Sequence, residues 1–207
     1  MKKKIFTIMI IMLLLIITMP IQTSALYDET QVIIDRKLDV RFLWFLPLLP
    51  QRMFGDIDIV SVSFSENEQQ PEMLFVTLTL RDLSTTPSQF DAGYTISWSY
   101  LNAYYIVVAH ILPQGEKFFS LGSSIDSSNS FENWISCEGF FDTTLKCITF
   151  SLSKESIGNP YLLSTLDNID ATAFMRPYDL DTRQPGADIF KDFTHNAKQI
   201  SSYTIKY

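Results

Sequence analysis

Hydrophobic and polar side chains alternate with a period of two along most of the chain after Gly55. In residues 94–100, for example, every second side chain is a Tyr, Ile or Trp, and the residues between them are Thr or Ser. Successive side chains of a β-strand point to opposite faces of a sheet, so this alternation predicts strands with one hydrophobic and one polar face. Helical periodicity is nearly absent beyond residue 25. The pattern therefore predicts an all-β protein.

About nine short runs are typical of strands, and turn-forming residues separate them. They cover residues 58–65, 74–81, 94–100, 104–111, 117–121, 133–141, 145–152, 171–176 and 202–207. Several alternate in this way, whereas the run at 104–111 is apolar on both faces and is expected to lie mid-sheet with both sides covered. The only helical candidates are a single turn at 154–158 and a short stretch at 161–166. Short strands at this spacing predict a two-sheet antiparallel β-sandwich of the jelly-roll kind.

Two local details affect which side chains share a face. In the first run, strict alternation places Val62 and Phe64 on one face and Ile59 on the other. Residues 66–71 are polar and are expected to form the loop before the second run. The turn at 101–103 holds either two or three residues, and because a slip of one residue exchanges the two faces of a strand, the register of the next strand stays open.

The N-terminal residues 1–25 have the pattern of a secretory signal peptide. Three Lys residues precede an apolar run, and the small residues Thr23, Ser24 and Ala25 follow it at the positions that a signal peptidase reads. The apolar run is short for a membrane span. An uncleaved anchor is the alternative, and only in that case do we expect contact with a membrane. Cleavage predicts a secreted or extracytoplasmic protein.

The remaining chain is expected to have two parts, a segment at 26–54 that packs on the sandwich and the sandwich domain itself at 55–207. The first part contains an apolar stretch that begins at Phe42 and ends at Pro50 and includes Trp44. Two prolines interrupt it and it is too short to cross a bilayer. Burial against the sandwich is the favoured interpretation, and an exposed contact patch is the alternative.

Charge and motifs narrow the function classes. The chain has 16 Lys and Arg against 23 Asp and Glu, a formal net charge of −7, which argues against a nucleic-acid partner. The nucleophile elbow, the zinc-protease helix and the phosphate-binding glycine loop are all missing from the sequence. His110 ends an apolar run and His195 lies in a polar one, so both are expected to be structural or solvated. We therefore expect a protein that is not an enzyme.

The two cysteines suggest a disulfide. Cys137 and Cys147 lie in successive predicted strands, and if Asp142 centres the turn, the two cysteines face each other directly. That separation suits a disulfide, and an exported chain meets an oxidising compartment. Two free buried thiols, or half of a metal site, are the alternatives. Zinc is disfavoured because the sequence shows no Cys-x-x-Cys motif or His pair to complete the ligand set.

Acidic residues gather in two places. Asp56 and Asp58 stand two apart at the start of the first strand, and Asp179, Asp181 and Asp188 fall in a long late loop. Calcium is bound by carboxylate and carbonyl oxygens, so Asp56, Asp58, Asp179 and Asp181 are the candidate ligands. Solvated loop acids are the favoured alternative, because no EF-hand loop is present.

Aromatic residues in the strands admit a binding interpretation. The candidates for stacking on a ligand are Trp98, Tyr100, Tyr105 and Trp134, with Tyr104 beside them. Their place in alternating strands makes packing in the core the favoured alternative. A binding platform requires two or three of them to be exposed on one face.

The order of these strands resembles the β-sandwich domains of family 9 carbohydrate-binding modules and DOMON domains, which are often appended to secreted peptidases and glycosidases. The resemblance covers about residues 55–207. The matching stretches are GDIDIVSV at 55–62, LTLRDL at 78–83, YTISW at 94–98, GFFD at 139–142, 148–152, 157–158 and 187–188. It implies a jelly-roll sandwich, an accessory binding role and, in some relatives, calcium near the first acidic strand, here Asp56 and Asp58. Some DOMON domains hold haem between Met and His, but Met73 and His110 match no motif and haem is not implied.

Three functions follow from these observations. The first is a non-catalytic secreted binding module for a glycan, another small ligand or a cell-surface polymer. The second is a structural or interaction protein of the cell envelope that uses the segment from Phe42 to Pro50 as its contact. The third is a hydrolase with a site that the sequence hides, which would require His110 or His195 to meet a Ser and an acid. We favour the first.

Overall fold

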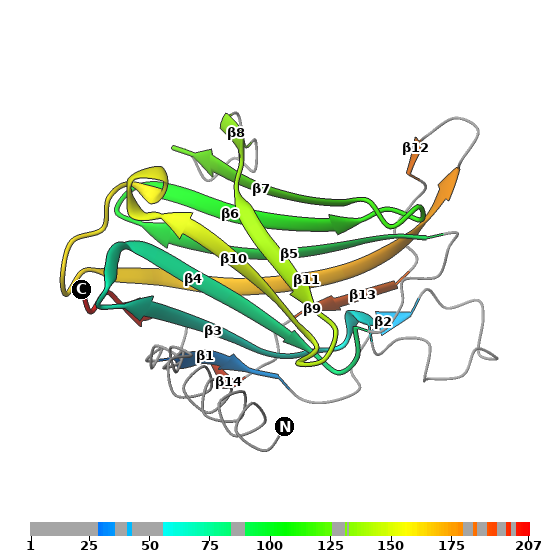
Figure 1. Ribbon diagram of the computed structural model, residues 1–207, viewed down its shortest axis with the longest axis horizontal. Coiled ribbons are helices and arrows are strands. Elements are labelled where there is room, and N and C mark those ends of the chain that lie inside the picture. The colour runs from blue at the N-terminus through cyan, green and yellow to red at the C-terminus, as the bar shows by residue number, and fades with distance from the viewer. Residues whose placement is uncertain are drawn as a thin grey trace, which may run out of the picture.

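The computed structural model describes residues 29–35, 41–42, 56–83, 90–125, 131, 133–179, 184–185, 190–193, 198–199 and 202–207. Two antiparallel sheets pack against each other, with no α-helix among these residues (Figure 1). The predicted fold class, an all-β protein built as a two-sheet sandwich, is confirmed. The predicted signal peptide at 1–25 and the residues that follow Phe42 up to Pro50 lie outside the described residues.

Sheet 1 has the strand order β14-β1-β3-β4-β10-β9. Its strands are β1 (Thr30–Ile34), β3 (Ile59–Asn67), β4 (Gln70–Leu80), β9 (Glu138–Asp142), β10 (Cys147–Ser153) and β14 (Lys198–Gln199). Two hairpins, β3–β4 and β9–β10, pair side by side through β4 and β10, and the short strand β1 adds part of the 26–54 segment to the same sheet. This sheet lies toward the viewer in Figure 1.

Sheet 2 has the order β2-β13-β11-β5-β6-β7-β8. Its strands are β2 (Arg41–Phe42), β5 (Phe90–Tyr100), β6 (Ala103–Ile111), β7 (Lys117–Ser124), β8 (Asn133–Ser136), β11 (Thr165–Asp179) and β13 (Phe190–Phe193), and both β12 (Gln184–Pro185) and β15 (Tyr203–Thr204) pair with β11. Consecutive antiparallel pairs make β5, β6, β7 and β8 a meander. The chain then crosses from β8 at the edge of sheet 2 to β9 at the edge of sheet 1.

A β-bulge corrects the predicted faces of the first strand. Ile59 pairs with Leu80 and Ser61 pairs with Thr79, so Val60 is an extra residue on β3. An extra residue reverses the alternation, and Ile59 therefore enters the same core as Val62 and Phe64 instead of lying on the opposite face.

Two other predicted elements also differ. The chain expected to be a loop at 66–71 is mostly strand, because β3 continues to Asn67 and the turn holds only Glu68 and Gln69. Residues 161–166 are a turn followed by the start of β11 rather than a helix. The single turn predicted at 154–158 is confirmed as a 3₁₀ helix, Lys154–Ile157, which ends at Gly158 in the left-handed conformation.

The register that the sequence left open is now defined. Tyr100 pairs with Ala103, so the turn holds two residues, Leu101 and Asn102. Tyr105 consequently lies opposite Trp98, and both side chains point into the core.

Aromatic side chains join the two sheets across the core. Phe64 of β3 meets Trp98 of β5 edge to face, with ring centroids 5.8 Å apart, and stacks on Tyr203 of β15 at 5.2 Å. Trp98 in turn stacks on Tyr105 at 6.0 Å. All four side chains are buried, so this cluster fills part of the space between the two sheets.

The predicted disulfide is wrong. Four residues, 143–146, form the turn between β9 and β10, and Cys147 pairs with Asp142 rather than with Cys137. Cys137 lies at the corner between β8 and β9, five residues before Asp142. At the rise of a strand, this places it about 16 Å from the position opposite Cys147. A disulfide requires Cα atoms within about 7 Å, so both cysteines are free.

Denatured, unreduced protein is therefore expected to show two titratable thiols. In the native protein, burial raises the pKa of the Cys137 thiol to about 11, so labelling at pH 8 should be slow. A kinetic assay with a coloured thiol reagent, run with and without denaturant, measures both quantities. Absence of reactive thiols in denaturant would show that the cysteines are bridged after all.

Candidate functional site

Three of the four predicted stacking residues lie in the core. Trp98 and Tyr100 are on the inward face of β5, and Tyr105 is brought inward opposite Trp98, so all three are buried beyond the reach of an external ligand. Trp134 is half exposed on β8, where it lies over Gly122: a Cβ at that glycine would be 3.0 Å from the indole. Tyr104, named beside them, is 37% exposed on β6, so Tyr104 and Trp134 are the two of these aromatic residues that a ligand could reach.

The predicted acidic ligands do not assemble into a metal site in the described part of the chain. Asp58 is buried and its carboxylate bonds to Nε of Arg81 at 2.5 Å, which accounts for its charge. Asp56 is buried near the start of β3, while the side chain of Asp179 and the whole of Asp181 lie outside the described residues. Among the residues described, no three His, Cys, Asp or Glu side chains are placed to hold a metal ion.

His110 belongs to a polar cluster that spans three strands of sheet 2. Its Nδ1 lies 3.1 Å from Oδ1 of the buried Asp91, and Nε of Arg176 donates to the other oxygen of that carboxylate at 2.7 Å. Burial by itself would raise the pKa of the Asp91 carboxyl, but the hydrogen bonds from His110 and Arg176 outweigh it and lower the pKa below its ordinary value. Asp91 is thus a carboxylate at neutral pH that joins β5 to β6 and β11. His195 lies outside the described residues.

The outer face of sheet 1 is rich in hydroxyl groups. The strand registers place Thr77 between Ser63 and Thr149, and Thr79 between Ser61 and Cys147. Seven Ser and Thr side chains share the face of these strands that points away from the core: Ser61, Ser63, Ser65, Thr77, Thr79, Thr149 and Ser151. Thr77, Thr79 and Ser151 are partly exposed, and the other four are buried. They alternate with core residues such as Val62 and Ile148, so the same strands present a hydrophobic layer inward and hydroxyl groups outward.

A pocket of about 440 Å³ opens on this face. Ser65, Thr77, Thr79 and Thr149 line it with short side chains, and Oγ1 of Thr77 lies 3.1 Å from Oγ1 of Thr149. The longer side chains of Phe75, Phe140 and Leu145 also line it. Short Ser and Thr side chains with the larger Phe75, Phe140 and Leu145 beside them therefore produce the hollow.

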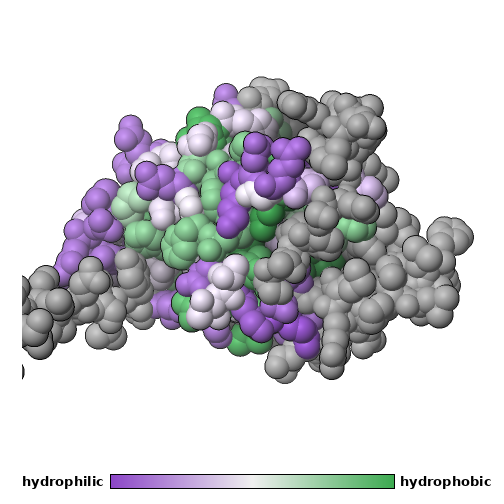
Figure 2. Space-filling view, turned by 45° about the vertical axis from the view of Figure 1, so that its right-hand side comes forward, coloured by the Kyte–Doolittle hydropathy of each residue, from purple (hydrophilic) through white to green (hydrophobic). Residues whose placement is uncertain are grey.

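Two of the three large hydrophobic residues of this pocket come from the edge of the sheet, and the third, Phe75, comes from the central strand β4. Phe140 stands opposite Thr149 on β9, and Leu145 comes from the turn between β9 and β10. Oδ1 of Asp142 fixes that turn by accepting hydrogen bonds from the backbone N–H groups of Thr144 and Leu145, each at 2.8 Å. Figure 2 shows hydrophobic side chains gathered at the centre of the molecule's surface in that view, with hydrophilic ones around them.

The polar lining of the pocket consists of neutral hydroxyl groups and two carboxylates. The Glu29 carboxylate accepts a hydrogen bond from Ser63, and Asp142 is occupied by its turn. Burial and the negative charge of Asp142 raise the pKa of the Cys147 thiol, so this sulfur is not a thiolate at neutral pH. The described lining of the pocket therefore offers hydroxyl groups, apolar contact and two carboxylates that already accept hydrogen bonds, and its thiol is protonated.

Comparisons with protein-family models, with curated proteins and with solved structures find no match for this chain. In the part of the chain that the structure describes, no helix has the length and hydrophobicity to span a membrane.

The sequence alone does not predict this pocket, although it holds part of the signal. The alternation of Ser61, Ser63 and Ser65, and of Thr77 and Thr79, is visible in the sequence. What the sequence does not show is that Thr149 of a strand 72 positions further on completes the same row.

Proposed function

We propose that this protein is a non-catalytic binding module and that the pocket on the outer face of sheet 1 binds a hydroxylated ligand, such as the sugar units of a glycan or cell-surface polymer. The single observation that carries the proposal is a row of Ser and Thr hydroxyl groups beside Phe75 and Phe140. Export by the predicted signal at 1–25 would bring the pocket to such ligands outside the cytoplasm.

The chemistry of the pocket fits that class of ligand. A hydroxyl group both donates and accepts hydrogen bonds, so Thr77, Thr79 and Thr149 match the hydroxyl groups of a sugar, which do the same. The C–H face of a sugar ring is apolar and packs on aromatic side chains, a role that Phe75 and Phe140 can fill. A volume of about 440 Å³ lies within the usual range for small-ligand sites.

The same lining residues disfavour a hydrolase. Glycoside cleavage requires two carboxyl groups that face the bond to be broken. Among the described residues that line this pocket, the two acids are Glu29 and Asp142, and both already accept hydrogen bonds, from Ser63 and from the turn at 143–146. The resemblance to carbohydrate-binding modules stays a prediction that agrees with this choice.

A glycan-array screen followed by calorimetry tests the proposal. Phe140→Ala should weaken binding of the best glycan by about tenfold, since it removes a contact face worth roughly 1–2 kcal/mol. The matched control is Phe118→Ala, because Phe118 is 51% exposed on β7 of sheet 2 and Phe140 is 52% exposed. Thr149→Val, which keeps the shape and removes the hydroxyl, should also weaken binding.

The screen can fail in two informative ways. Uniform silence on the array would refute glycan binding. Equal losses in the Phe118 and Phe140 variants would show that the glycan binds elsewhere.

A further inference from the structure

Three consecutive apolar side chains project from the turn that follows Pro160. Tyr161, Leu162 and Leu163 are 68%, 55% and 73% exposed. Single exposed apolar residues are normal on protein surfaces, whereas adjacent ones that form a patch mark contact sites. This turn lies at one end of the sandwich, away from the pocket of sheet 1, since none of its three residues lines that pocket.

The backbone of this turn is fixed. Both the N–H and the Oγ of Ser164 donate to the carbonyl of Tyr161, at 2.9 and 2.6 Å. Leu163 donates its N–H to the carbonyl of Ile205 at 2.9 Å, and Ile205 returns a bond to the carbonyl of Ser164. Leu163 has a φ of 67°, a conformation that is unfavourable for a leucine, so the surrounding bonds hold it there.

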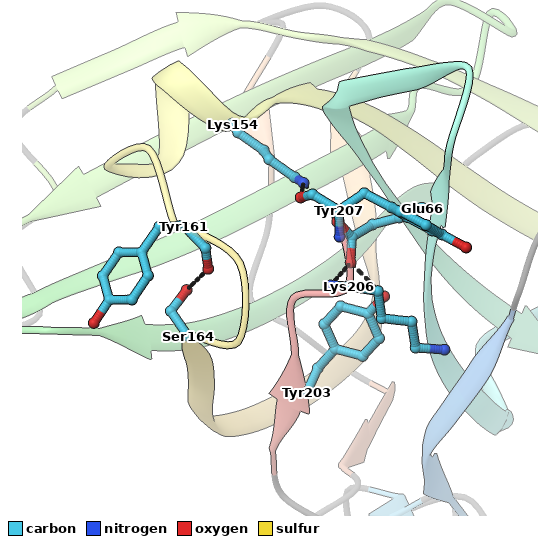
Figure 3. Close-up of polar contacts among 7 residues, drawn as sticks. All are labelled: Glu66, Lys154, Tyr161, Ser164, Tyr203, Lys206 and Tyr207. Carbon is cyan, nitrogen blue, oxygen red and sulfur yellow. Dashed lines mark hydrogen bonds and ion pairs between the residues drawn. The ribbon is translucent and has the colours of Figure 1, made fainter.

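A buried ion pair anchors the segments on both sides of the turn. Lys154, in the 3₁₀ helix that precedes it, places Nζ 2.5 Å from Oε2 of Glu66 and also donates to the carbonyl of Tyr207. Glu66 further accepts from the hydroxyl of Tyr203 and the N–H of Lys206, both at 2.8 Å. In Figure 3 the Tyr161 ring points away from this cluster, which leaves the ring available for contact.

A groove of about 570 Å³ adjoins the apolar turn. Tyr161, Leu162 and Tyr207 supply apolar surface, and the exposed residues Glu72 and Glu155 supply two carboxylates. Among the described residues that line it, the only cation is Lys154, whose charge is already paired with Glu66. The groove therefore combines apolar surface with uncompensated negative charge.

We propose that this groove and the apolar turn, residues 161–163, form a docking surface for a segment of another protein that carries Lys or Arg beside apolar side chains. The apolar side chains of that segment would cover Tyr161, Leu162 and Leu163, and its cations would meet Glu72 and Glu155. Charge complementarity is what selects this partner, because the same carboxylates, on a chain with a net charge of −7, repel anionic lipid head groups. The proposal does not depend on glycan binding.

Selection from a phage-displayed library of short random peptides, with the full chain immobilised, tests this surface. We expect the selected peptides to combine Lys or Arg with adjacent apolar residues. Fluorescence anisotropy with a selected peptide should show binding that weakens as salt is added, because screening reduces the attraction to Glu72 and Glu155. The variant Glu72→Gln/Glu155→Gln should bind more weakly and show a smaller dependence on salt.

The apolar turn offers a close control pair. The variant Leu162→Asn/Leu163→Asn should lower the affinity for the peptide by about tenfold or more, since central apolar contacts carry most of the affinity in such interfaces. Leu101→Asn should change it by less than about twofold: Leu101 is 76% exposed and has a φ of 54°, close to the values of Leu163, but it lies in the turn between β5 and β6. Asn is chosen because it tolerates a positive φ.

Three results would overturn the proposal: no enrichment of cationic peptides, full affinity in the Leu162→Asn/Leu163→Asn variant, or an equal loss in Leu101→Asn. Sedimentation with vesicles of phosphatidylcholine and phosphatidylglycerol tests binding to a membrane. If the protein sediments with the vesicles and the Leu162→Asn/Leu163→Asn variant does not, the turn binds a lipid surface instead. Far-UV circular dichroism of each variant separates loss of binding from loss of fold.

Discussion

Replacing Glu66 with Gln is expected to lower the free energy of unfolding by about 3–5 kcal/mol. The carboxylate of Glu66 is fully buried and accepts hydrogen bonds from Lys154, Tyr203, Lys206 and Tyr207. The substitution leaves the buried ammonium group of Lys154 without its counter-charge, and an unpaired buried charge is far more costly than a missing surface pair. Urea denaturation at pH 7 measures the change.

A second variant distinguishes the charge from the shape of the side chain. In Glu66→Gln/Lys154→Met both charges are gone, so this double variant should be more stable than the sum of the two single losses implies. Additive losses would show that the two residues act independently and that the buried pair is not the reason for the effect. The Lys146–Asp82 pair, whose charged atoms are 3.9 Å apart on the surface, serves as the control, and Lys146→Met should cost less than about 1 kcal/mol.

Replacing Phe64 with Ala should also lower the free energy of unfolding by about 3–5 kcal/mol. Phe64 is fully buried and contacts Trp98 of sheet 2 and Tyr203 of the C-terminal strand, so the cavity would open where three parts of the chain meet. The surrounding rings belong to different strands and cannot collapse into the space together. Thermal or urea unfolding followed by tryptophan fluorescence reports the loss.

The comparison for Phe64 is the exposed Phe118 on β7. Phe118→Ala removes the same side chain at the surface and should change stability by less than about 1 kcal/mol. A loss in Phe64→Ala as small as that in Phe118→Ala would mean that the space between the sheets is not tightly packed around this ring.

The sandwich could be predicted from the sequence because alternation with a period of two is a local property of each strand. Trp98 and Tyr100 lie on one face whatever the strand pairs with, and the structure confirms their shared face. Strict alternation predicts the wrong face for Ile59, because the bulge at Val60 depends on pairing with β4 and no residue in the strand itself signals it.

The disulfide prediction fails for a different reason, the length of the turn between β9 and β10. The prediction placed Asp142 at the centre of the turn, whereas Asp142 ends β9 and uses its side chain to hold the four residues that follow. Lys146 closes the turn with a φ of 58°, which a sequence pattern does not reveal for a lysine. A change in turn length moves every pair of the hairpin, and the two cysteines with it.

The two candidate sites depend on contacts between distant parts of the chain. Glu66 lies in a polar stretch that reads as a loop, and its partners Lys154 and Tyr203 are 88 and 137 positions away. The hydroxyl row likewise needs the register of β10 against β4 to bring Thr149 to Thr77. The sequence gives the residue types, but the pairing of strands in the two sheets determines which of these residues become neighbours.

The corner at Cys137 has a consequence for how the molecule opens. One residue joins β8 to β9, the outermost strands of the two sheets on that side, and its N–H bonds to the carbonyl of Phe119 at 3.2 Å. The two sheets are thus covalently joined along that edge of the sandwich. We expect local unfolding to begin at the opposite edge, where the outermost strands β2 and β14 are only two residues long. In hydrogen–deuterium exchange, the backbone amides of that edge should exchange first.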